Sequence, residues 1–302
     1  NWNPYQDTRL TPNMKKSSST WKEAKEKIAL TKKEASLVWY IKAPKVGEKR
    51  KQYDQISLDD VRIPKNKKDM IHSIILSQKS GQAVNLEKIS APQYQGKELF
   101  LDFEFMSNPN DSDNAIIYLI GASYLDGSEL KYSCWYIHQN SELFRNEEYS
   151  MLQRFLNWID EFEPGLIVHW GNAEKHQINS AMKRHPSLSS SIKENLFNDS
   201  VVWFDLMKTF QENKVGIPGC LNFKLKSITS GLISLGLIDQ KYNYNSLECA
   251  KASESMDLAI KYYGLWCRNV HYIEPLIHEI IKYNQLDCDI MYHIGNSNSI
   301  WN

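Results

Sequence analysis

Polar and hydrophobic residues alternate with a period of two in three consecutive segments, a pattern that predicts β-strands. The segments are residues 98–106 (ELFLDFEFM), 115–125 (AIIYLIGASYL) and 131–138 (KYSCWYIH), and each contains aromatic residues, which favour strands. A polar sequence, SNPNDSDN, separates the first two segments. We therefore expect these three strands to form a meander.

Helical and strand patterns alternate after this meander. Residues 147–162 carry an apolar stripe at helical spacing, formed by Met151, Phe155, Leu156 and Ile159. Buried strands are predicted at 165–170 and 201–205, and helices around 174–184, 223–236, 253–262 and 271–294. Three strands followed by alternating helices and strands are typical of an α/β domain with a mixed sheet.

The first part of the chain has a mainly helical pattern. Ser19 or Thr20 is expected to cap a helix that begins at Trp21. The apolar run at 36–42 fits either a strand or a buried helical turn, and further on Ser57 is a candidate N-cap and Pro64 a helix breaker. An apolar stripe that we expect to pack in a core is formed by Met70, Ile71, Ile74 and Ile75.

Charge is distributed unevenly along the 302 residues. The chain has 36 Lys and Arg against 36 Asp and Glu, but residues 1–90 carry 19 basic and 10 acidic residues, and residues 91–302 carry 17 and 26. A basic region joined to an acidic domain suggests that the first meets a polyanion while the second holds cations. A solvated, lysine-rich helical surface explains the basic region equally well.

Cysteine usage and hydropathy exclude several classes of protein. The five cysteines are widely spaced and contain no C-x-x-C pair, which argues against a disulfide framework or a zinc site and favours a reducing, intracellular compartment. The longest apolar runs are too short to span a bilayer, so no membrane partner is expected. The chain does not begin with Met and has no apolar signal region, so we expect it to be a piece of a longer protein with further domains.

Three acidic segments carry the strongest chemical signal. On a strand, Asp102 and Glu104 share one face, and two carboxylates on one face of a core strand need a compensating cation. Tyr283 and Asp287 lie one helical turn apart in the last predicted helix, and Glu174 follows the apolar strand at 165–170. Oxygen ligands suit hard cations such as Mg²⁺, and carboxylates in this order are what two-metal phosphodiester chemistry needs.

This ordered set resembles the exonuclease motifs of the DEDD superfamily, tyrosine subtype, which implies a ribonuclease H-like fold. The context resembles more closely the ribonuclease H-like nuclease domain of RecB-like proteins. The matching pieces are LFLDFEF, IYLIGAS, IVHWGNAEKHQI, VVWFDLMKTF, FKLKSI and YNQLDCD, and residues 21–90 are similar to the segment that precedes this domain. We accordingly expect a basic, mainly helical connecting region at 1–95 and the ribonuclease H-like exonuclease domain at 96–302.

The resemblance implies a role for each acidic residue. Asp102 would bridge two Mg²⁺ or Mn²⁺ ions, Glu104 and Asp287 would complete the ligand set, and Tyr283 would orient or help deprotonate the attacking water. Glu174 takes the third acidic position, where the broader superfamily usually has Asp and the RecB-like branch resembles this chain in having Glu. The histidine subtype is disfavoured, because Lys282 stands five residues before Asp287.

The function implied is a 3′ to 5′ exonuclease that hydrolyses DNA, with RNA as a possible substrate. Two alternatives stay open: a degenerate nucleic-acid-binding module of a larger nuclease or helicase protein, and a structure-selective endonuclease of the same fold. Lys224 and Lys226 are candidate contacts for substrate phosphates, although exposed lysines without a function are equally common. Asp205 is expected to cap the end of its strand, with a role behind the metal ligands or as a substrate contact left open. Phe103 is expected to pack in the core rather than stack on a base.

Overall fold

The computed structural model describes residues 22–45, 48–108, 111–137, 144–244, 252–266 and 274–296. These residues form two compact units. The first unit comprises the described residues up to Ile89 together with Thr209–Leu237, and the second comprises Ser90–Lys208 together with the described residues from Ile238 onward. The boundary expected near residue 95 for the family domain stays a prediction.

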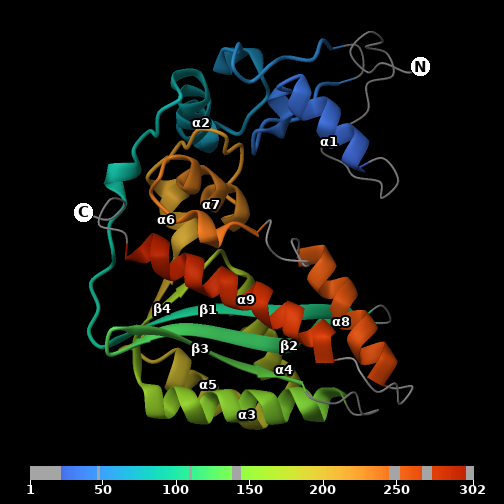
Figure 1. Cartoon of the computed structure of the whole chain (residues 1–302), viewed down its shortest axis with the longest axis vertical. Helices are drawn as coiled ribbons and strands as arrows, with labels where there is room; N and C mark the ends of the chain where they lie inside the picture. Colours follow the sequence, from blue (N-terminus) through green and yellow to red (C-terminus); the bar gives the residue numbers. More distant parts are fainter. Residues whose placement is uncertain are drawn as a thin grey trace. The chain divides into compact units, whose positions relative to one another are not determined.

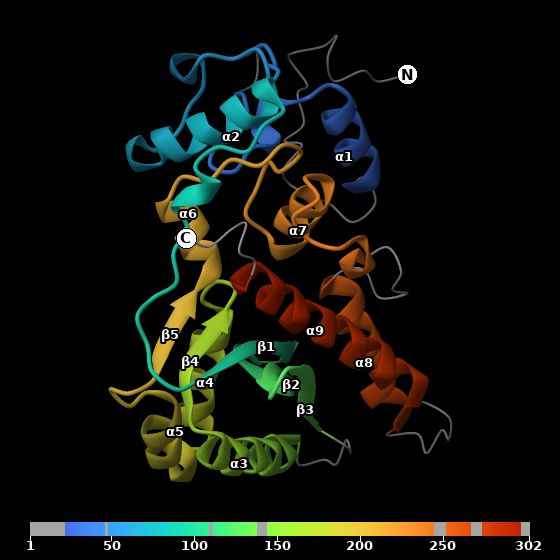
Figure 2. The same ribbon diagram turned by 60° about the vertical axis from the view of Figure 1, so that its left-hand side comes forward.

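The second unit is built on a mixed five-stranded sheet (Figure 1). Its strands are β1 (Lys97–Asn108), β2 (Asp111–Asp126), β3 (Glu129–Tyr136), β4 (Pro164–His169) and β5 (Val202–Asp205), in the order β3-β2-β1-β4-β5. The first three pair antiparallel as the predicted meander, whereas β4 pairs parallel with β1 and β5 parallel with β4 (Figure 2). The predicted α/β class with a mixed sheet is confirmed.

Helices cover both faces of this sheet (Figure 1). One face carries α3 (Phe144–Phe162), α4 (Ala173–Arg184) and α5 (Ser189–Leu196), and the other carries α8 (Ala252–Trp266) and α9 (Glu274–Gly295). A 3-10 turn, η6 (Pro186–Leu188), joins α4 to α5, and another, η7 (Gln240–Tyr242), precedes α8. The predicted stripe on α3 is buried in the main core. None of the helices in the described part of the chain has the length and apolar character needed to cross a bilayer.

The alternation of β1 sends its side chains to opposite faces of the sheet. Leu99, Leu101 and Phe103 are buried in the core, and the ring of Phe103 meets that of Phe155 from α3 edge to face. The expectation that Phe103 packs in the core is confirmed. Asp102 and Glu104 therefore lie on the face that α8 and α9 cover.

The first unit is mainly helical, as expected. It contains α1 (Lys22–Thr31), α2 (Lys68–Ser80), α7 (Leu225–Ser234) and the 3-10 turns η2 (Ala35–Leu37), η3 (Leu58–Asp60), η4 (Lys65–Lys67) and η5 (Leu86–Lys88), while α6 (Leu206–Glu212) lies where the chain passes between units. Ser57 caps η3 with a capping box, and the four apolar residues predicted on α2 are buried. The run at 36–42 lies in the 3-10 turn η2 and the turns that follow it, with Tyr40 at a positive φ, so it is a helical turn and not a strand. The predicted cap at Ser19 or Thr20 lies outside the described residues.

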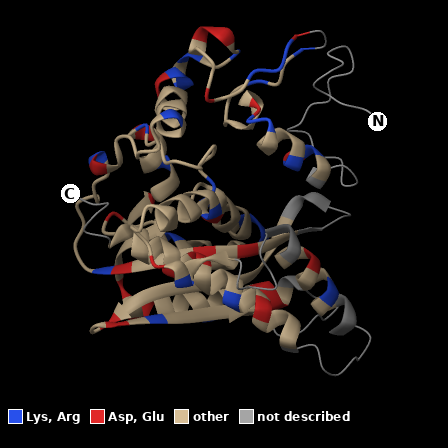
Figure 3. Cartoon of the chain, turned by 45° about the horizontal axis from the view of Figure 1, so that its top comes forward, with Lys and Arg blue, Asp and Glu red and all other residues tan. Residues whose placement is uncertain are grey.

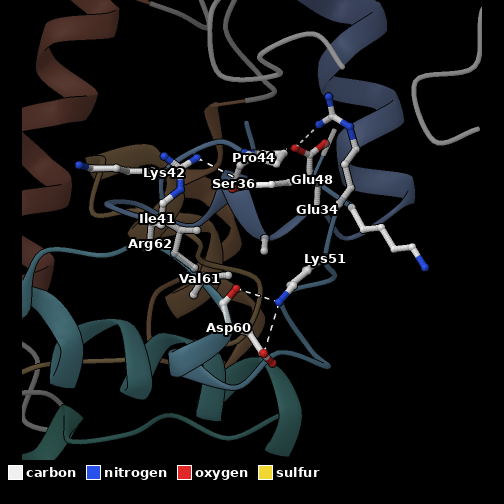
Figure 4. Close-up of a pocket in the computed structure, with 13 residues that line it drawn as sticks. Glu34, Ser36, Ile41, Lys42, Pro44, Glu48, Lys51, Asp60, Val61 and Arg62 are labelled. Carbon is white, nitrogen blue, oxygen red and sulfur yellow. Dashed lines mark hydrogen bonds and ion pairs between the residues drawn. The ribbon is translucent and has the colours of Figure 1, made fainter. Parts of the chain in front are cut away.

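Residues 209–237 join the first unit through specific contacts with α2 and the segment after it. The side-chain amide of Gln78 donates to the carbonyl of Ile217 at 2.9 Å and accepts from the amide of Gly219 at 2.9 Å. Val84 and Gly216 form an isolated antiparallel bridge. A pocket of about 340 Å³ in this unit is lined by basic and acidic residues, among which Lys51 pairs with Asp60 (Figure 4). The predicted acidic residues do not line this pocket.

Candidate active site

Sheet register and helix placement bring the predicted acidic residues of the second unit together. Asp102 and Glu104 come from β1, and Tyr283 and Asp287 come from α9, which packs on the same face. Glu174 lies in the first turn of α4, immediately beyond the carboxyl end of β4, the parallel neighbour of β1. Figure 3 shows acidic positions on the strands of this unit and on the helices around them.

Asp102 lies in a field of negative charge. Burial raises the pKa of its carboxyl well above the ordinary value, and the carboxylates of Asp287, Glu104 and Glu174 raise it further. Four carboxylates that repel one another in this way attract a cation. The joint role of these four residues in catalysis stays a prediction.

Neutral donors hold three of the four carboxylates. The side-chain amide of Asn284 donates to Oδ2 of Asp102 at 2.7 Å. Ser255, from α8, donates its hydroxyl to Oε2 of Glu104 at 2.9 Å. The hydroxyl of Tyr244 donates to Oδ1 of Asp287. Because these donors carry no charge, they orient the carboxylates without neutralising them.

Glu174 is held differently. Its side chain is buried, with 3 % of its surface exposed, and its Oε2 atom has no hydrogen-bond partner among the described residues. The imidazole of His169 lies beside it, with Nδ1 at 3.4 Å from that oxygen. His169 is fully buried, and neither of its ring nitrogens has a hydrogen-bond partner in the described part of the chain. A buried carboxylate oxygen without a donor is costly, and a bound cation would satisfy it.

Tyr283 is buried beside the carboxylates. Burial raises the pKa of its phenol far above the ordinary value, and Asp287, Glu104 and Asp102 raise it further. The phenol is therefore protonated at neutral pH, which makes it a hydrogen-bond donor. Its ring lies 6.2 Å from that of Tyr244, measured between centroids.

The donor set fits a hard divalent cation because all its charged atoms are carboxylate oxygens. In the arrangement that the described residues adopt, however, no group of three or more His, Cys, Asp or Glu side chains converges closely enough to hold an ion. Instead, the carboxylates of Asp102, Glu104 and Asp287 are directed to hydrogen-bond donors of the protein.

The remaining predicted residues have other positions. Lys224 is exposed directly before α7, and Lys226 is half-buried in its first turn. Both belong to the first unit, and their role as phosphate contacts stays a prediction. Asp205 ends β5 and accepts hydrogen bonds from the amides of Gly171 and Lys208, at 2.9 and 3.0 Å, which confirms the predicted cap.

The sequence interpretation missed the residues that hold the carboxylates: Asn284, Ser255, Tyr244 and Tyr118, whose hydroxyl lies 3.4 Å from Oε2 of Glu104. Asn284 alone had a usable signal, because it lies in the same helical turn as Tyr283 and Asp287. Ser255 and Tyr244 lie in segments without a motif, and Tyr118 lies in the piece IYLIGAS, where its contact with Glu104 depends on the sheet register.

A model of the ribonuclease H superfamily matches residues 99–297. No curated protein matches the chain. The matched range includes β1 from Leu99 onward, β2 to β5, and the helices α8 and α9, and together with the mixed sheet it confirms the ribonuclease H-like fold.

Proposed function

The chain belongs to the ribonuclease H superfamily, and on this basis we propose that it is a metal-dependent nuclease, specifically a 3′ to 5′ exonuclease of the DEDD type that acts on DNA. The observation that carries the proposal is the placement of Asp102 and Glu104 on β1 beneath Asp287 of α9, with Glu174 at the start of α4, in one nuclease-type fold. The carboxylates of Asp287, Glu104 and Glu174 all act to raise the pKa of Asp102. The match to the superfamily supports the reaction class, phosphodiester hydrolysis. The ordered acidic motifs support the DEDD type and the resemblance to RecB-like proteins.

Two divalent ions, Mg²⁺ or Mn²⁺, would activate the attacking water and stabilise the leaving 3′ oxygen when bound. Asp102, Glu104, Glu174 and Asp287 would be their ligands. The buried, unpartnered oxygen of Glu174 supports this assignment, because a cation would satisfy it. Tyr283, as a protonated phenol, would donate a hydrogen bond that orients the water or a phosphate oxygen.

The partner is a nucleic acid, and the basic residues of the first unit, Lys224 and Lys226 among them, are suited to its phosphates. We infer that further domains of a longer protein supply part of the binding.

A second candidate is a module that binds nucleic acid without cutting it. It is favoured by one observation: within the described residues, the carboxylates are directed to protein donors rather than arranged around a common point. The two candidates differ in metal affinity, since a competent site is stabilised by Mn²⁺ and a degenerate one is not.

The test uses single-stranded DNA labelled at the 5′ or the 3′ end, with RNA in parallel, incubated with Mg²⁺ or Mn²⁺. The parent should shorten the 5′-labelled strand from its 3′ end, and Asp102→Asn with Glu104→Gln should abolish this. A matched control replaces two exposed acids of α3, Asp160→Asn with Glu161→Gln, and should cut like the parent. Cleavage of a circular single strand would indicate an endonuclease, and no cleavage with either metal would favour the binding module.

A further inference from the structure

The side-chain amide of Asn284 directs both of its N–H groups at one acidic residue. Its Nδ2 donates to Oδ2 of Asp102 at 2.7 Å and to the backbone carbonyl of the same residue at 3.2 Å. Asn284 is fully buried. An amide nitrogen has two donors, so these contacts use its complete donor capacity and fix the carboxylate relative to its own backbone.

The other end of the amide is fixed from a third element. The hydroxyl of Tyr132, on β3, donates to Oδ1 of Asn284 at 2.8 Å. If the amide were flipped, its oxygen would face the carboxylate of Asp102, and two acceptors would oppose each other. The hydroxyl of Tyr132 therefore helps to determine which end of the amide faces Asp102.

A glycine makes room for this arrangement. Gly121 on β2 is the strand partner of Asp102 on β1 and of Cys134 on β3, and its φ is not in the left-handed region. A Cβ atom at this position would lie 1.6 Å from Oδ1 of Asn284 and 2.6 Å from the hydroxyl of Tyr132. Space for the amide, rather than backbone freedom, thus explains the glycine.

We infer that Asn284 is a positioning residue for Asp102, and that Tyr132 and Gly121 hold it in the orientation that directs the Asp102 carboxylate toward a divalent cation. The inference rests on the proposed function. A neutral amide suits this task, because Lys or Arg in its place would neutralise Asp102 and compete with the cation. Ligand carboxylates in metal sites are themselves hydrogen-bonded, and losing such a partner typically costs about 10- to 100-fold in metal affinity or activity.

The test begins with Tyr132→Phe in the full chain, because this variant removes one hydroxyl that does not touch Asp102. Mn²⁺ affinity is measured by electron paramagnetic resonance titration well below the unfolding temperature, and nuclease kcat and KM are measured separately. We expect affinity about 10-fold weaker and a lower kcat with KM unchanged. Asn284→Asp and Gly121→Ala should cause larger losses, since the first removes the donor and the second displaces it.

The matched control is Tyr263→Phe, which removes another buried tyrosine hydroxyl, one that donates to the carbonyl of Ile137 at 3.0 Å. Tyr263→Phe should lower the midpoint of thermal unfolding about as much as Tyr132→Phe does, and it should leave Mn²⁺ affinity unchanged.

Two outcomes overturn the inference, and they are distinguishable. If the parent binds Mn²⁺ and cuts DNA while Tyr132→Phe retains parental affinity and kcat, Asn284 is structural only, and the proposed function stands. If the parent itself neither binds Mn²⁺ nor cuts, the proposed function fails and this inference fails with it. Any failure of Gly121→Ala to fold does not affect the result, because Tyr132→Phe decides it.

Discussion

The imidazole of His169 and the carboxylate of Glu174 lie 3.4 Å apart in the interior, one at the end of β4 and the other in the first turn of α4. The strand and the helix are joined by a short turn, so the position of Glu174 is determined by the sheet itself. Glu174 thus lies beyond the carboxyl end of β4, close enough to Asp102 for its charge to raise the pKa of that carboxyl.

Replacing Glu174 by Gln tests its proposed role as a ligand. The change keeps the shape of the side chain and removes its charge, so the Mn²⁺ concentration needed for half-maximal stabilisation should rise at least about 10-fold. Thermal unfolding at increasing Mn²⁺ measures this. Glu194→Gln, at an exposed position of α5, is the control and should follow the parent. Equal Mn²⁺ responses in the parent and Glu174→Gln would remove Glu174 from the ligand set.

Asp102→Asn should stabilise the protein when no metal is bound. Burial and the neighbouring carboxylates raise the pKa of Asp102 in the folded state above its ordinary value of 3.8. The folded state therefore holds the proton of Asp102 more tightly than the unfolded state does. The stability that the parent gains from this proton is present below the unfolded pKa and is lost as the pH rises through the folded pKa.

The stabilisation by Asp102→Asn should accordingly grow as the pH rises from the unfolded pKa of 3.8 towards the higher folded pKa of Asp102. Thermal unfolding in a chelating buffer measures it. When Mn²⁺ is present, the parent should be more stable than Asp102→Asn, because only the parent binds the ion. A constant difference across this pH range would show that Asp102 does not titrate as proposed.

Tyr283→Phe should separate catalysis from metal binding. The phenol is proposed to orient a reactant and not to bind the ion, so kcat should fall by about 100-fold or less, with Mn²⁺ affinity unchanged. The control is Tyr292→Phe, on the same helix. The ring of Tyr292 packs edge to face on Phe100, and the loss of its hydroxyl should leave full activity. Weaker Mn²⁺ binding in Tyr283→Phe would assign the phenol to the ligand shell instead.

Glu148 is the centre of a buried ionic network that should make the second unit sensitive to acid. It accepts hydrogen bonds from Arg184 at 2.5 and 2.9 Å, from His185 at 2.8 Å and from the amide of Ile117 at 2.9 Å. Burial acts to raise the pKa of Glu148, but the hydrogen bonds from His185 and Arg184 outweigh it and lower the pKa below 4.5. The resulting stability is present above the unfolded pKa and is lost as the pH falls through the folded pKa.

Glu148→Gln leaves Arg184 buried without its carboxylate and should cost about 3–5 kcal/mol near neutral pH. The difference from the parent should shrink as the pH falls below about 4.5, because Glu148 gains a proton there in the unfolded parent and only at a lower pH in the folded one. Urea unfolding at several pH values measures both. An unchanged urea midpoint at neutral pH would contradict the prediction.

Gln78→Ala tests whether residues 209–237 depend on α2. The side chain makes three hydrogen bonds to the segment 217–220, including one to the carbonyl of Cys220 at 3.3 Å. Their loss should cost about 2–3 kcal/mol, and the Gly219 amide should exchange its hydrogen faster. Gln82→Ala, at an exposed position, should stay within about 0.5 kcal/mol of the parent. Unaltered protection at Gly219 would argue against the dependence.

Local patterns predicted most of the sheet and the long helices, because their buried faces repeat with a clear period. The strand at β4 is buried along its whole length, and α3 carries a complete apolar stripe. The helix α5 was missed because its serine-rich sequence has only Ile192 and Leu196 buried. The short helix α6 was also not predicted. It begins directly after Asp205, and a single capping residue is not enough to predict a helix.

The candidate site was predicted only as far as its charged residues. The spacing of two residues on β1 predicts that Asp102 and Glu104 share a face of the strand. The spacing of four on α9 predicts the same for Tyr283 and Asp287 on their helix. The roles of Asn284, Tyr132 and Gly121 depend on three elements that are far apart in the sequence, and no local pattern contains that information. Tyr244 and Ser255 were missed for the same reason.

The discontinuity of the first unit has a consequence for how the chain folds. Residues 209–237 contribute the partners of Gln78 and Val84. The five strands of the sheet, with α3, α4 and α5, lie between these residues and the first segment of the unit in the sequence. During synthesis from the amino terminus, α2 emerges long before α7, so its contacts with that segment must wait until the intervening residues have been made. The unit that begins first on the ribosome therefore cannot be completed until most of the other has already been synthesised.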